Sequence, residues 1–125
     1  MERKNNNTPT ILVVDDFEEL RSTLRLWLEQ RGYKVVEAED GDDAIEVARQ
    51  EHPALILMDI GMPERSGLSA TYAIRKDPDL RDIPIIAVTA YAAELHADAL
   101  KAGCVECLAK PVDTDQLDRL LSTLL

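Results

Sequence analysis

The sequence predicts an α/β fold in which a five-stranded parallel sheet is doubly wound, with five helices distributed over its two faces. Three observations predict this fold. Short apolar runs alternate five times with longer amphipathic segments, as in repeated βαβ units. Three of the runs (ILVV, ALILM and IIAV) are apolar throughout, which is typical of central strands buried on both faces. The other two (YKVVEA and CVECLA) include charged residues, which is typical of strands at the sheet's edges.

Length and composition indicate one globular domain with an acidic surface. The 125 residues are 46% hydrophobic and 30% charged, and the net charge is −10. This charge argues against direct nucleic-acid binding, because an acidic surface repels a duplex. No apolar run approaches the roughly 20 residues that span a membrane, and the polar opening MERKNNNTPT lacks a signal-peptide core. We expect a cytoplasmic protein with a disordered arm over residues 1–9 and one domain over residues 10–125.

The expected strands cover residues 10–14, 34–38, 54–58, 84–88 and 105–109, and the expected helices cover 17–31, 42–50, 65–76, 92–101 and 114–124. In the first helix leucines recur every four residues, and Gly32 is placed to end it. Asp40 is placed to cap the second helix. The last helix has an apolar stripe of leucines, and Asp113 with Gln116 forms a capping-box pattern before it.

The composition of the strands also predicts their order in the sheet. Lys34, Glu37 and Glu106 mark the second and fifth strands as edge strands. With right-handed crossovers, the order 2-1-3-4-5 follows, which is the flavodoxin-like arrangement. In such sheets ligands bind beyond the carboxyl ends of the strands, where the winding direction reverses. Here that point lies between the first and third strands.

Polar residues follow the apolar runs at this end of the predicted sheet. Asp15 and Asp16 follow the first strand, Asp59 the third, Thr89 the fourth and Lys110 the fifth. Clustered carboxylates repel one another unless a cation or a proton intervenes. Carboxylate oxygens suit a hard ion such as Mg²⁺, with Mn²⁺ as an alternative. Thr89 and Lys110 add a hydroxyl donor and a positive charge, which suit a phosphoryl group. A cis Lys110–Pro111 bond would turn Lys110 toward this site; a trans bond is the other interpretation.

Other interpretations of these acidic and thiol groups are weaker. Asp15 or Asp16 could cap the first helix, but capping does not explain both together with Asp59. The acidic group at residues 40–43 lacks the spacing of a calcium-binding loop and fits a helix start. Cys104 and Cys107 form a C-x-x-C that could be a redox pair or half of a zinc site. Two small buried residues are the simpler interpretation.

The ordered motifs VVDD (13–16), LILMDIGMP (55–63), AVTA (87–90) and AKP (109–111) resemble the receiver domain of two-component response regulators, with its chemotaxis-regulator-like fold. The resemblance covers residues 10–124. It implies that Asp59 is the phospho-acceptor and takes its phosphoryl group from a phosphohistidine on a partner. It implies that Asp15, Asp16, Asp59 and the Gly61 backbone carbonyl bind Mg²⁺. Thr89 and Lys110 would then contact the phosphoryl group.

The resemblance also implies a signalling switch that assists its own phosphorylation and dephosphorylation, not an enzyme with a separate substrate. The implied partners are a sensor histidine kinase or a histidine phosphotransfer protein. A downstream protein target would bind the face formed by the fourth helix, fifth strand and fifth helix. The chain departs from the family at the aromatic switch position, which is Cys107 here. Gly61 and Tyr91 occupy positions that are expected to tune hydrolysis of the phosphoryl group.

Two other functional classes use a similar sheet. A haloacid-dehalogenase-like phosphatase also has an aspartyl nucleophile, but that family places it in a D-x-D motif, and residue 17 here is Phe. A flavodoxin-like FMN-binding protein would meet repulsion from the acidic segment DDFEE (15–19). Neither G-x-x-x-x-G-K-[ST] nor G-x-G-x-x-G occurs in the sequence, so nucleotide binding is unsupported.

Overall fold

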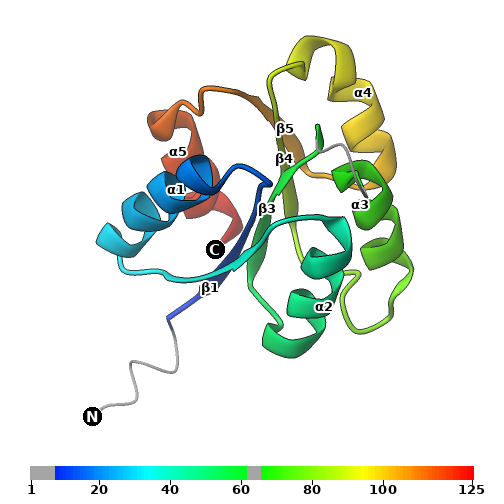
Figure 1. Cartoon of the computed structure of the whole chain (residues 1–125), viewed down its shortest axis with the longest axis horizontal. Helices are drawn as coiled ribbons and strands as arrows, with labels where there is room; N and C mark the ends of the chain where they lie inside the picture. The colour runs from blue at the N-terminus through cyan, green and yellow to red at the C-terminus, as the bar shows by residue number, and fades with distance from the viewer. Residues whose placement is uncertain (1–7, 62–65) are drawn as a thin grey trace.

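The computed structural model describes residues 8–61 and 66–125, which form a parallel sheet covered by helices on both faces (Figure 1). The strands are β1 (Thr10–Val14), β2 (Lys34–Ala38), β3 (Leu55–Asp59), β4 (Ile85–Thr89) and β5 (Glu106–Ala109). The helices are α1 (Glu18–Gln30), α2 (Gly41–Glu51), α3 (Gly67–Lys76), α4 (Ala92–Ala102) and α5 (Thr114–Leu124). Each lies within about two residues of the predicted range. Residue 65, the predicted start of the third helix, and residues 1–7 of the predicted arm lie outside the described residues.

The sheet has the predicted order β2-β1-β3-β4-β5, and every neighbouring pair is parallel. The register places the carboxyl ends of the strands side by side: Val14 pairs with Met58, Asp59 with Val88, and Thr89 with Ala109. β1, β3 and β4 are buried almost throughout, whereas β2 and β5 contain exposed or half-buried charged residues. The charge content of each strand therefore predicted its place correctly.

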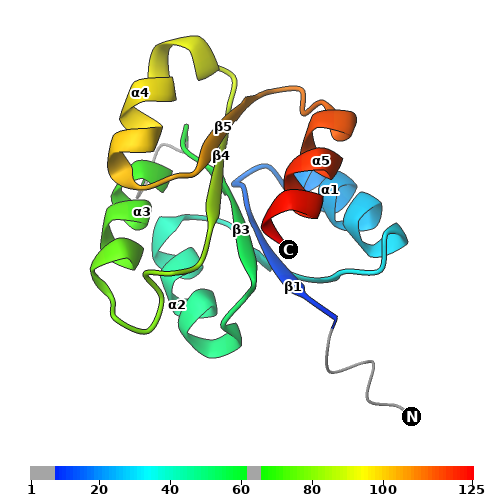
Figure 2. The same ribbon diagram turned by 180° about the vertical axis from the view of Figure 1, so that it is seen from behind.

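Two hydrophobic clusters fill the space between the sheet and the helices. α1 and α5 cover one face, where Leu28, Leu117 and Leu121 pack against residues of the sheet. α2, α3 and α4 cover the other face, where Ala48, Ile74 and other apolar residues pack. Both views show α1 and α5 on one side of the sheet and α2, α3 and α4 on the other (Figure 1 and Figure 2). Alternate side chains along each strand supply the two clusters, because successive residues point to opposite faces.

The predicted helix ends are largely present. The Asp40 side chain accepts a hydrogen bond from the Asp43 N–H, and Asp113 accepts from the N–H groups of Asp115 and Gln116. Gly32 follows α1 with a φ of +91°, in the left-handed region that glycine tolerates best. Lys110–Pro111 is a cis peptide bond. Among the described helices, none is long and apolar enough to cross a membrane.

Candidate functional site

The predicted site residues meet at the carboxyl ends of the strands. Asp15 directly follows β1, Asp59 ends β3, Thr89 ends β4 and Lys110 directly follows β5. The Lys110 N–H donates to the Thr89 carbonyl over 2.9 Å, which holds the last two of these segments together. The residues lie on both sides of the point between β1 and β3 where the winding direction reverses, as the sheet order predicted.

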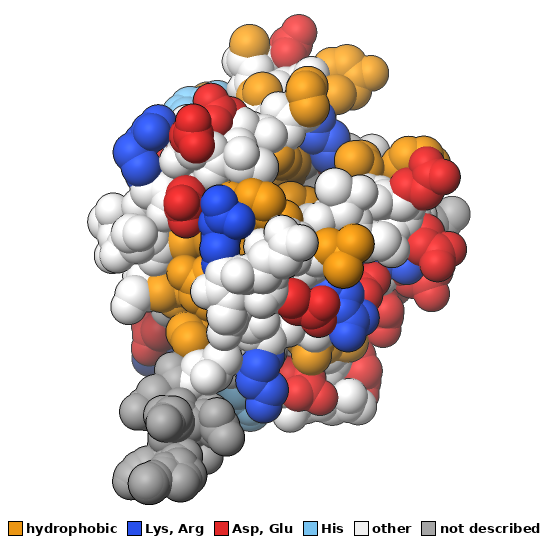
Figure 3. Space-filling model, turned by 90° about the vertical axis from the view of Figure 1, so that its left-hand side faces the viewer, with side chains coloured by type: hydrophobic (Ala, Val, Ile, Leu, Met, Phe, Trp, Pro, Cys, Tyr) orange, Lys and Arg blue, Asp and Glu red, His pale blue; other side chains and the backbone are white. Residues whose placement is uncertain are grey.

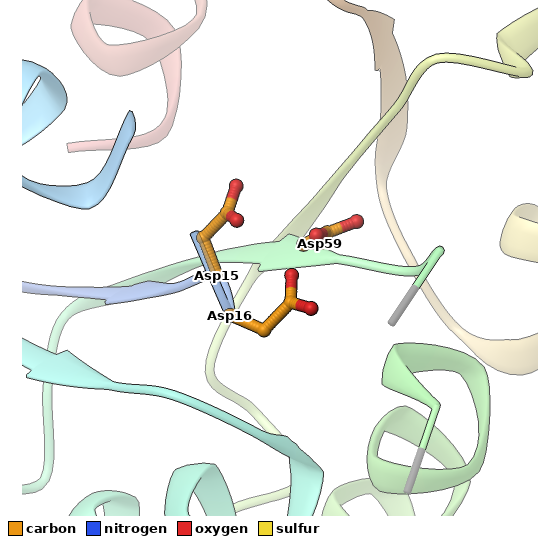
Figure 4. Close-up of side chains that lie close together, drawn as sticks. All are labelled: Asp15, Asp16 and Asp59. Carbon is orange, nitrogen blue, oxygen red and sulfur yellow. The ribbon is translucent and has the colours of Figure 1, made fainter. Parts of the chain in front are cut away.

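Three carboxylates form the acidic part of the site. Asp15, Asp16 and Asp59 each offer an oxygen atom, and these atoms lie within 4.8 Å of one another. In Figure 4 the three side chains gather at the ends of β1 and β3. Asp15 and Asp59 are buried, whereas Asp16 is exposed. The cluster is therefore closed on the protein side and open to solvent at Asp16.

Lys110 connects two of these carboxylates. Its ammonium group lies 3.0 Å from Asp15 Oδ2 and 3.3 Å from Asp59 Oδ2. Burial lowers the pKa of Lys110, but the contacts with Asp15 and Asp59 raise it by more, so the net shift is upward. The side chain therefore stays positively charged at neutral pH. A fixed cation at this position can stabilise negative charge on a bound group.

Several opposing effects act on the pKa of the Asp59 carboxyl group. Burial has the largest effect on this carboxyl and raises its pKa. A hydrogen bond from the Gly61 N–H to Oδ1 (2.8 Å) and the charge of Lys110 oppose that shift, while the charge of Asp15 adds to it. The net pKa of Asp59 is above its ordinary value. The ionised carboxylate is thus poorly compensated in the metal-free protein, and an added cation would relieve it.

Thr89 and Gly61 border the same space as Asp59. The Thr89 side chain is buried, and its Oγ1 accepts a hydrogen bond from the Tyr91 N–H over 3.0 Å. A Cβ atom at position 61 would lie 3.5 Å from Asp59 Oδ1 and 3.7 Å from Thr89 Oγ1. Glycine at this position therefore leaves room beside the Asp59 Oδ1 atom. The Tyr91 side chain is exposed next to this region.

The sequence did not reveal the role of Gly67, the first residue of α3. A Cβ atom at this position would collide with the Asp59 carbonyl oxygen and would lie 2.8 Å from Met58 Cγ. Glycine lets the start of α3 approach the end of β3 closely. No sequence pattern predicts this need, because it arises only when the helix packs against the strand.

Asp15, shortly before α1, interacts both with the start of the helix and with Lys110. The cap residue Phe17 makes no side-chain capping bond, and Asp15 Oδ1 accepts the Phe17 N–H over 2.9 Å. Asp15 Oδ2 faces Lys110. One oxygen of Asp15 thus orders the entry to the helix and the other faces Lys110, which agrees with the expectation that capping could explain one aspartate but not the whole acidic group.

A hollow with apolar walls adjoins the site on the α1 and α5 side. Leu20, Leu24 and Trp27 line it together with Asp15 and Lys110. Figure 3, which faces this side, shows hydrophobic side chains within a depression. The guanidinium of Arg31 stacks over the Trp27 ring, 3.8 Å from the ring centroid. Leu20 is 38% exposed, which is more than its place in the predicted leucine stripe suggested.

The two cysteines of the C-x-x-C lie within the fold. Cys104 and Cys107 are free thiols and both are buried. Burial raises the pKa of each thiol, which disfavours the thiolate that redox exchange and metal binding require. Cys104 contacts the Thr71 hydroxyl over 3.9 Å. They are small buried residues, as the simpler interpretation predicted.

The site combines oxygen ligands for a hard divalent cation with a lysine and a hydroxyl that suit a phosphoryl group. Comparison with known proteins agrees with this chemistry. Residues 11–122 match the model of the response regulator receiver domain. The chain belongs to this family. The resemblance in the sequence motifs is thereby confirmed, and the haloacid-dehalogenase-like and FMN-binding alternatives lose their support.

The chain is similar in sequence and in structure to characterised response regulators and receiver domains. The polar-differentiation response regulator DivK of Brucella ovis is 39% identical over 106 residues, which are 84% of this chain and 86% of DivK. The receiver domain of the sensor histidine kinase PA1611 of Pseudomonas aeruginosa is 35% identical with a TM-score of 0.86. The comparison covers 94% of this chain and 97% of that one, and that structure has a magnesium ion coordinated in its active-site cleft.

A further structure shares the fold over almost the whole chain. The response regulator TrrA of Thermotoga maritima, solved in complex with Mg²⁺ and BeF, is 33% identical with a TM-score of 0.85. The comparison covers 94% of this chain and 100% of TrrA. The protein is thus a receiver in two-component signalling, and its partners are kinases or phosphotransfer proteins of such systems.

Proposed function

We propose that Asp59 of this receiver domain accepts a phosphoryl group from a phosphohistidine in a Mg²⁺-dependent reaction. One observation carries the proposal: the carboxylates of Asp15, Asp16 and Asp59 gather beside the Lys110 ammonium and the Thr89 hydroxyl. Asp59 is the central member, because its Oδ2 faces Lys110 and its Oδ1 borders the open space beside Gly61.

In the proposed reaction an Asp59 carboxylate oxygen attacks phosphorus and the phosphorus–nitrogen bond of the phosphohistidine breaks. The electron pair of that bond stays on the imidazole of the partner. Lys110 neutralises charge on the phosphoryl oxygens as they pass through the transition state. The Thr89 hydroxyl accepts a hydrogen bond from the Tyr91 N–H, and a hydroxyl also has one proton that it can donate to a phosphoryl oxygen. The Gly61 N–H orients the acceptor carboxylate.

The carboxylates of Asp15, Asp16 and Asp59 fit a magnesium ion. They supply hard oxygen donors, and Mg²⁺ in proteins usually binds one or two carboxylates together with water and phosphate oxygens. Mn²⁺ shares these preferences. The Gly61 carbonyl is a further expected ligand. When bound, the ion would supply positive charge that offsets the repulsion among the carboxylates and the charge on the phosphoryl group.

The protein acts as a switch rather than as an enzyme that turns over a separate substrate. We expect it to assist its own phosphorylation and dephosphorylation in the cytoplasm. The downstream target is expected on the face of α4, β5 and α5. The exposed side chains of Leu100 on α4 and Val105 just before β5 give this face apolar contact area. Its surface is not expected to bind nucleic acid directly, given the net charge of −10.

Intact-mass measurement tests the proposal. With acetyl phosphate and Mg²⁺, the protein should gain the mass of one phosphoryl group, and EDTA should prevent the gain. Asp59→Asn should abolish labelling. Asp98→Asn is the matched control, since it removes one charge from an exposed position on α4 and should be labelled normally. Undiminished labelling of Asp59→Asn would refute the assignment of the acceptor. Repeated turnover of a small phosphoester by the parent would instead favour an enzyme.

A further inference from the structure

The peptide between Asp15 and Asp16 is held from outside the acidic cluster. The Asp15 carbonyl oxygen accepts a hydrogen bond from Arg21 Nη1 over 2.8 Å. The Asp15 N–H donates to the Ala38 carbonyl on β2 over 3.2 Å. The side-chain oxygens of Asp15 accept from Phe17 and Lys110. Every polar atom of Asp15 is therefore engaged, and Arg21 supplies the bond to its carbonyl.

Arg21 is itself fixed by an edge strand. Its Nε donates to Glu37 Oε1 over 2.9 Å, and its side chain is only 16% exposed. Glu37 lies on β2 in register with Val13 of β1. The other oxygen of Glu37 accepts from Arg25 Nη1 over 2.6 Å. The guanidinium of Arg21 on α1 thus makes one hydrogen bond to the residue after β1 and another to β2.

Glu37 is ionised in this arrangement. Burial works to raise its pKa, but hydrogen bonds from Arg21 and Arg25 outweigh burial, and the pKa lies below its ordinary value. Bonds between a guanidinium and a carboxylate are stronger and better oriented than bonds between neutral groups. The Glu37 carboxylate therefore defines where the Arg21 guanidinium points.

We propose that Arg21, oriented by Glu37, is a positioning residue for divalent-cation binding. The Asp15 carbonyl belongs to the peptide that joins Asp15 to Asp16. A bond to this oxygen fixes the peptide plane, and the plane sets the directions in which both carboxylates leave the backbone. The proposal rests on the proposed function, because it concerns the cation that Asp15, Asp16 and Asp59 would hold.

A positioning role for Arg21 and a purely electrostatic role predict opposite changes in Mg²⁺ affinity when Arg21 is removed. Arg21 is a positive charge near an acidic site, so its removal should tighten Mg²⁺ binding if charge alone mattered. If positioning dominates, removal should weaken binding. Loss of a group that orients a metal ligand typically lowers affinity about 10- to 100-fold. The sign of the change therefore distinguishes the two.

Isothermal titration of the full chain with MgCl₂ provides the test. Arg21→Met keeps the aliphatic stem and removes the donors; we expect the Mg²⁺ Kd to rise about tenfold or more. Arg25→Met is the matched control: it changes the same charge on the same helix and the same partner Glu37, but Arg25 donates to Glu29 and Glu37 rather than to Asp15. It should leave the Kd within about twofold.

Two further variants keep the test open if Arg21→Met does not fold. Arg21→Lys preserves the charge but lacks the planar fork that serves two acceptors, so Mg²⁺ binding should weaken. Glu37→Gln should weaken it less, because Arg21 keeps its bond to the Asp15 carbonyl. In metal-free protein, the amide chemical shifts of Asp16 and Phe17 should differ from those of the parent in the Arg21 variants. In Arg25→Met they should match those of the parent.

The possible results separate the positioning role of Arg21 from the proposed Mg²⁺-dependent function. Tighter or unchanged Mg²⁺ binding in the Arg21 variants would overturn the positioning role while leaving the proposed function intact. Equal weakening by Arg21→Met and Arg25→Met would also overturn it, since the bond to Asp15 would then be irrelevant. A parent protein that binds no Mg²⁺ would instead overturn the metal-dependent function itself.

Discussion

At the scale of single residues, Asp59 combines burial with an incomplete set of partners. One hydrogen bond from Gly61 and a shared lysine do not fully offset its burial and the nearby charge of Asp15, so its pKa is raised. A functional group held in an unfavourable environment commonly lowers the stability of the fold. Asp59 is therefore expected to make the metal-free protein less stable than a variant with a neutral side chain.

We predict that Asp59→Asn raises the free energy of unfolding in EDTA at neutral pH by about 0.5–2 kcal/mol. Urea unfolding followed by circular dichroism measures it. The pH dependence follows from the raised pKa. The native carboxyl keeps its proton to higher pH than the unfolded one, so stability falls as pH rises from about 3.9 through the native pKa. The gain from Asn should thus be absent at low pH and complete above the native pKa.

Asp98→Asn removes an equal charge from an exposed site and serves as the control for net charge. If it stabilised the protein as much as Asp59→Asn, the effect would be a general one of acidity. A folded Asp59→Asn variant less stable than the parent at neutral pH would contradict the unfavourable placement of this carboxylate.

The residues of the site were predictable because each follows an apolar run at a strand end, and parallel strands end along one side of a sheet. Arg21, Glu37 and Gly67 were not predictable. Arg21 and Glu37 are 16 residues apart and meet only through packing of α1 beside β2. Gly67 matters only because α3 approaches the Asp59 carbonyl. Sequence patterns report the period of an element, but not which atoms meet across two elements.

At the scale of elements, the two ends of α4 are held differently. Near its carboxyl end, the Gly103 carbonyl accepts hydrogen bonds from Arg75 Nε and Nη2 over 3.0 and 2.8 Å. Arg75 Nη1 also binds the carbonyls of Arg81 and Ile83 before β4. At its amino end, the cap residue Tyr91 makes no side-chain capping bond and is 62% exposed. The amino end is therefore the end with fewer restraints.

We predict that activation moves residues 89–95 more than residues 104–108. Thr89 gains a charged acceptor only when Asp59 carries a phosphoryl group, so its hydroxyl should turn toward the site and shift the segment leading to Tyr91. Cys107 is buried and too small to transmit the change by rotation. Amide chemical shifts with and without beryllofluoride and Mg²⁺ measure the response.

The Thr89→Ala variant is the control, because it removes the hydroxyl while leaving Asp59 and Lys110 in place. Its response over residues 89–95 should be much smaller. Large shifts centred on Cys107 with Tyr91 unchanged would contradict the prediction.

The elements themselves were predicted well, since strand burial, helical stripes and end signals such as Asp40, Gly32 and Asp113 agree with one another. At the start of α1, for which no cap was predicted, the cap residue Phe17 makes no side-chain capping bond. Asp15 orders that turn through the Phe17 N–H while it serves the site. Asp15 thus takes the place of an ordinary cap at this turn while its other oxygen faces Lys110.

At the scale of the whole molecule, the site draws on β1, β3, β4 and the residue after β5. These segments come together only in the folded chain. A cation held by Asp15, Asp16 and Asp59 would therefore bind the native state and not the unfolded one. Such selective binding stabilises the whole fold by mass action.

We predict that Mg²⁺ at 100 times its Kd raises the free energy of unfolding of the parent by about 2.7 kcal/mol. Thermal and urea unfolding over a MgCl₂ series measures the rise. NaCl at matched ionic strength controls for general screening of the acidic surface. Asp15→Asn should lose most of the gain and Asp98→Asn should keep it. An equal gain from NaCl, or from MgCl₂ in Asp15→Asn, would argue against a specific cation site.

Trp27 gives the molecule a built-in optical reporter. It is the one tryptophan in the sequence, and it lines the hollow that Asp15 and Lys110 also line. Indole emission responds to nearby charge, and Arg31 already lies over one side of the ring. A change of charge at Asp15 or a movement of Lys110 would therefore alter the fluorescence of the unlabelled protein. The chain could report cation binding and phosphorylation in real time, in a stopped-flow instrument and without an attached dye.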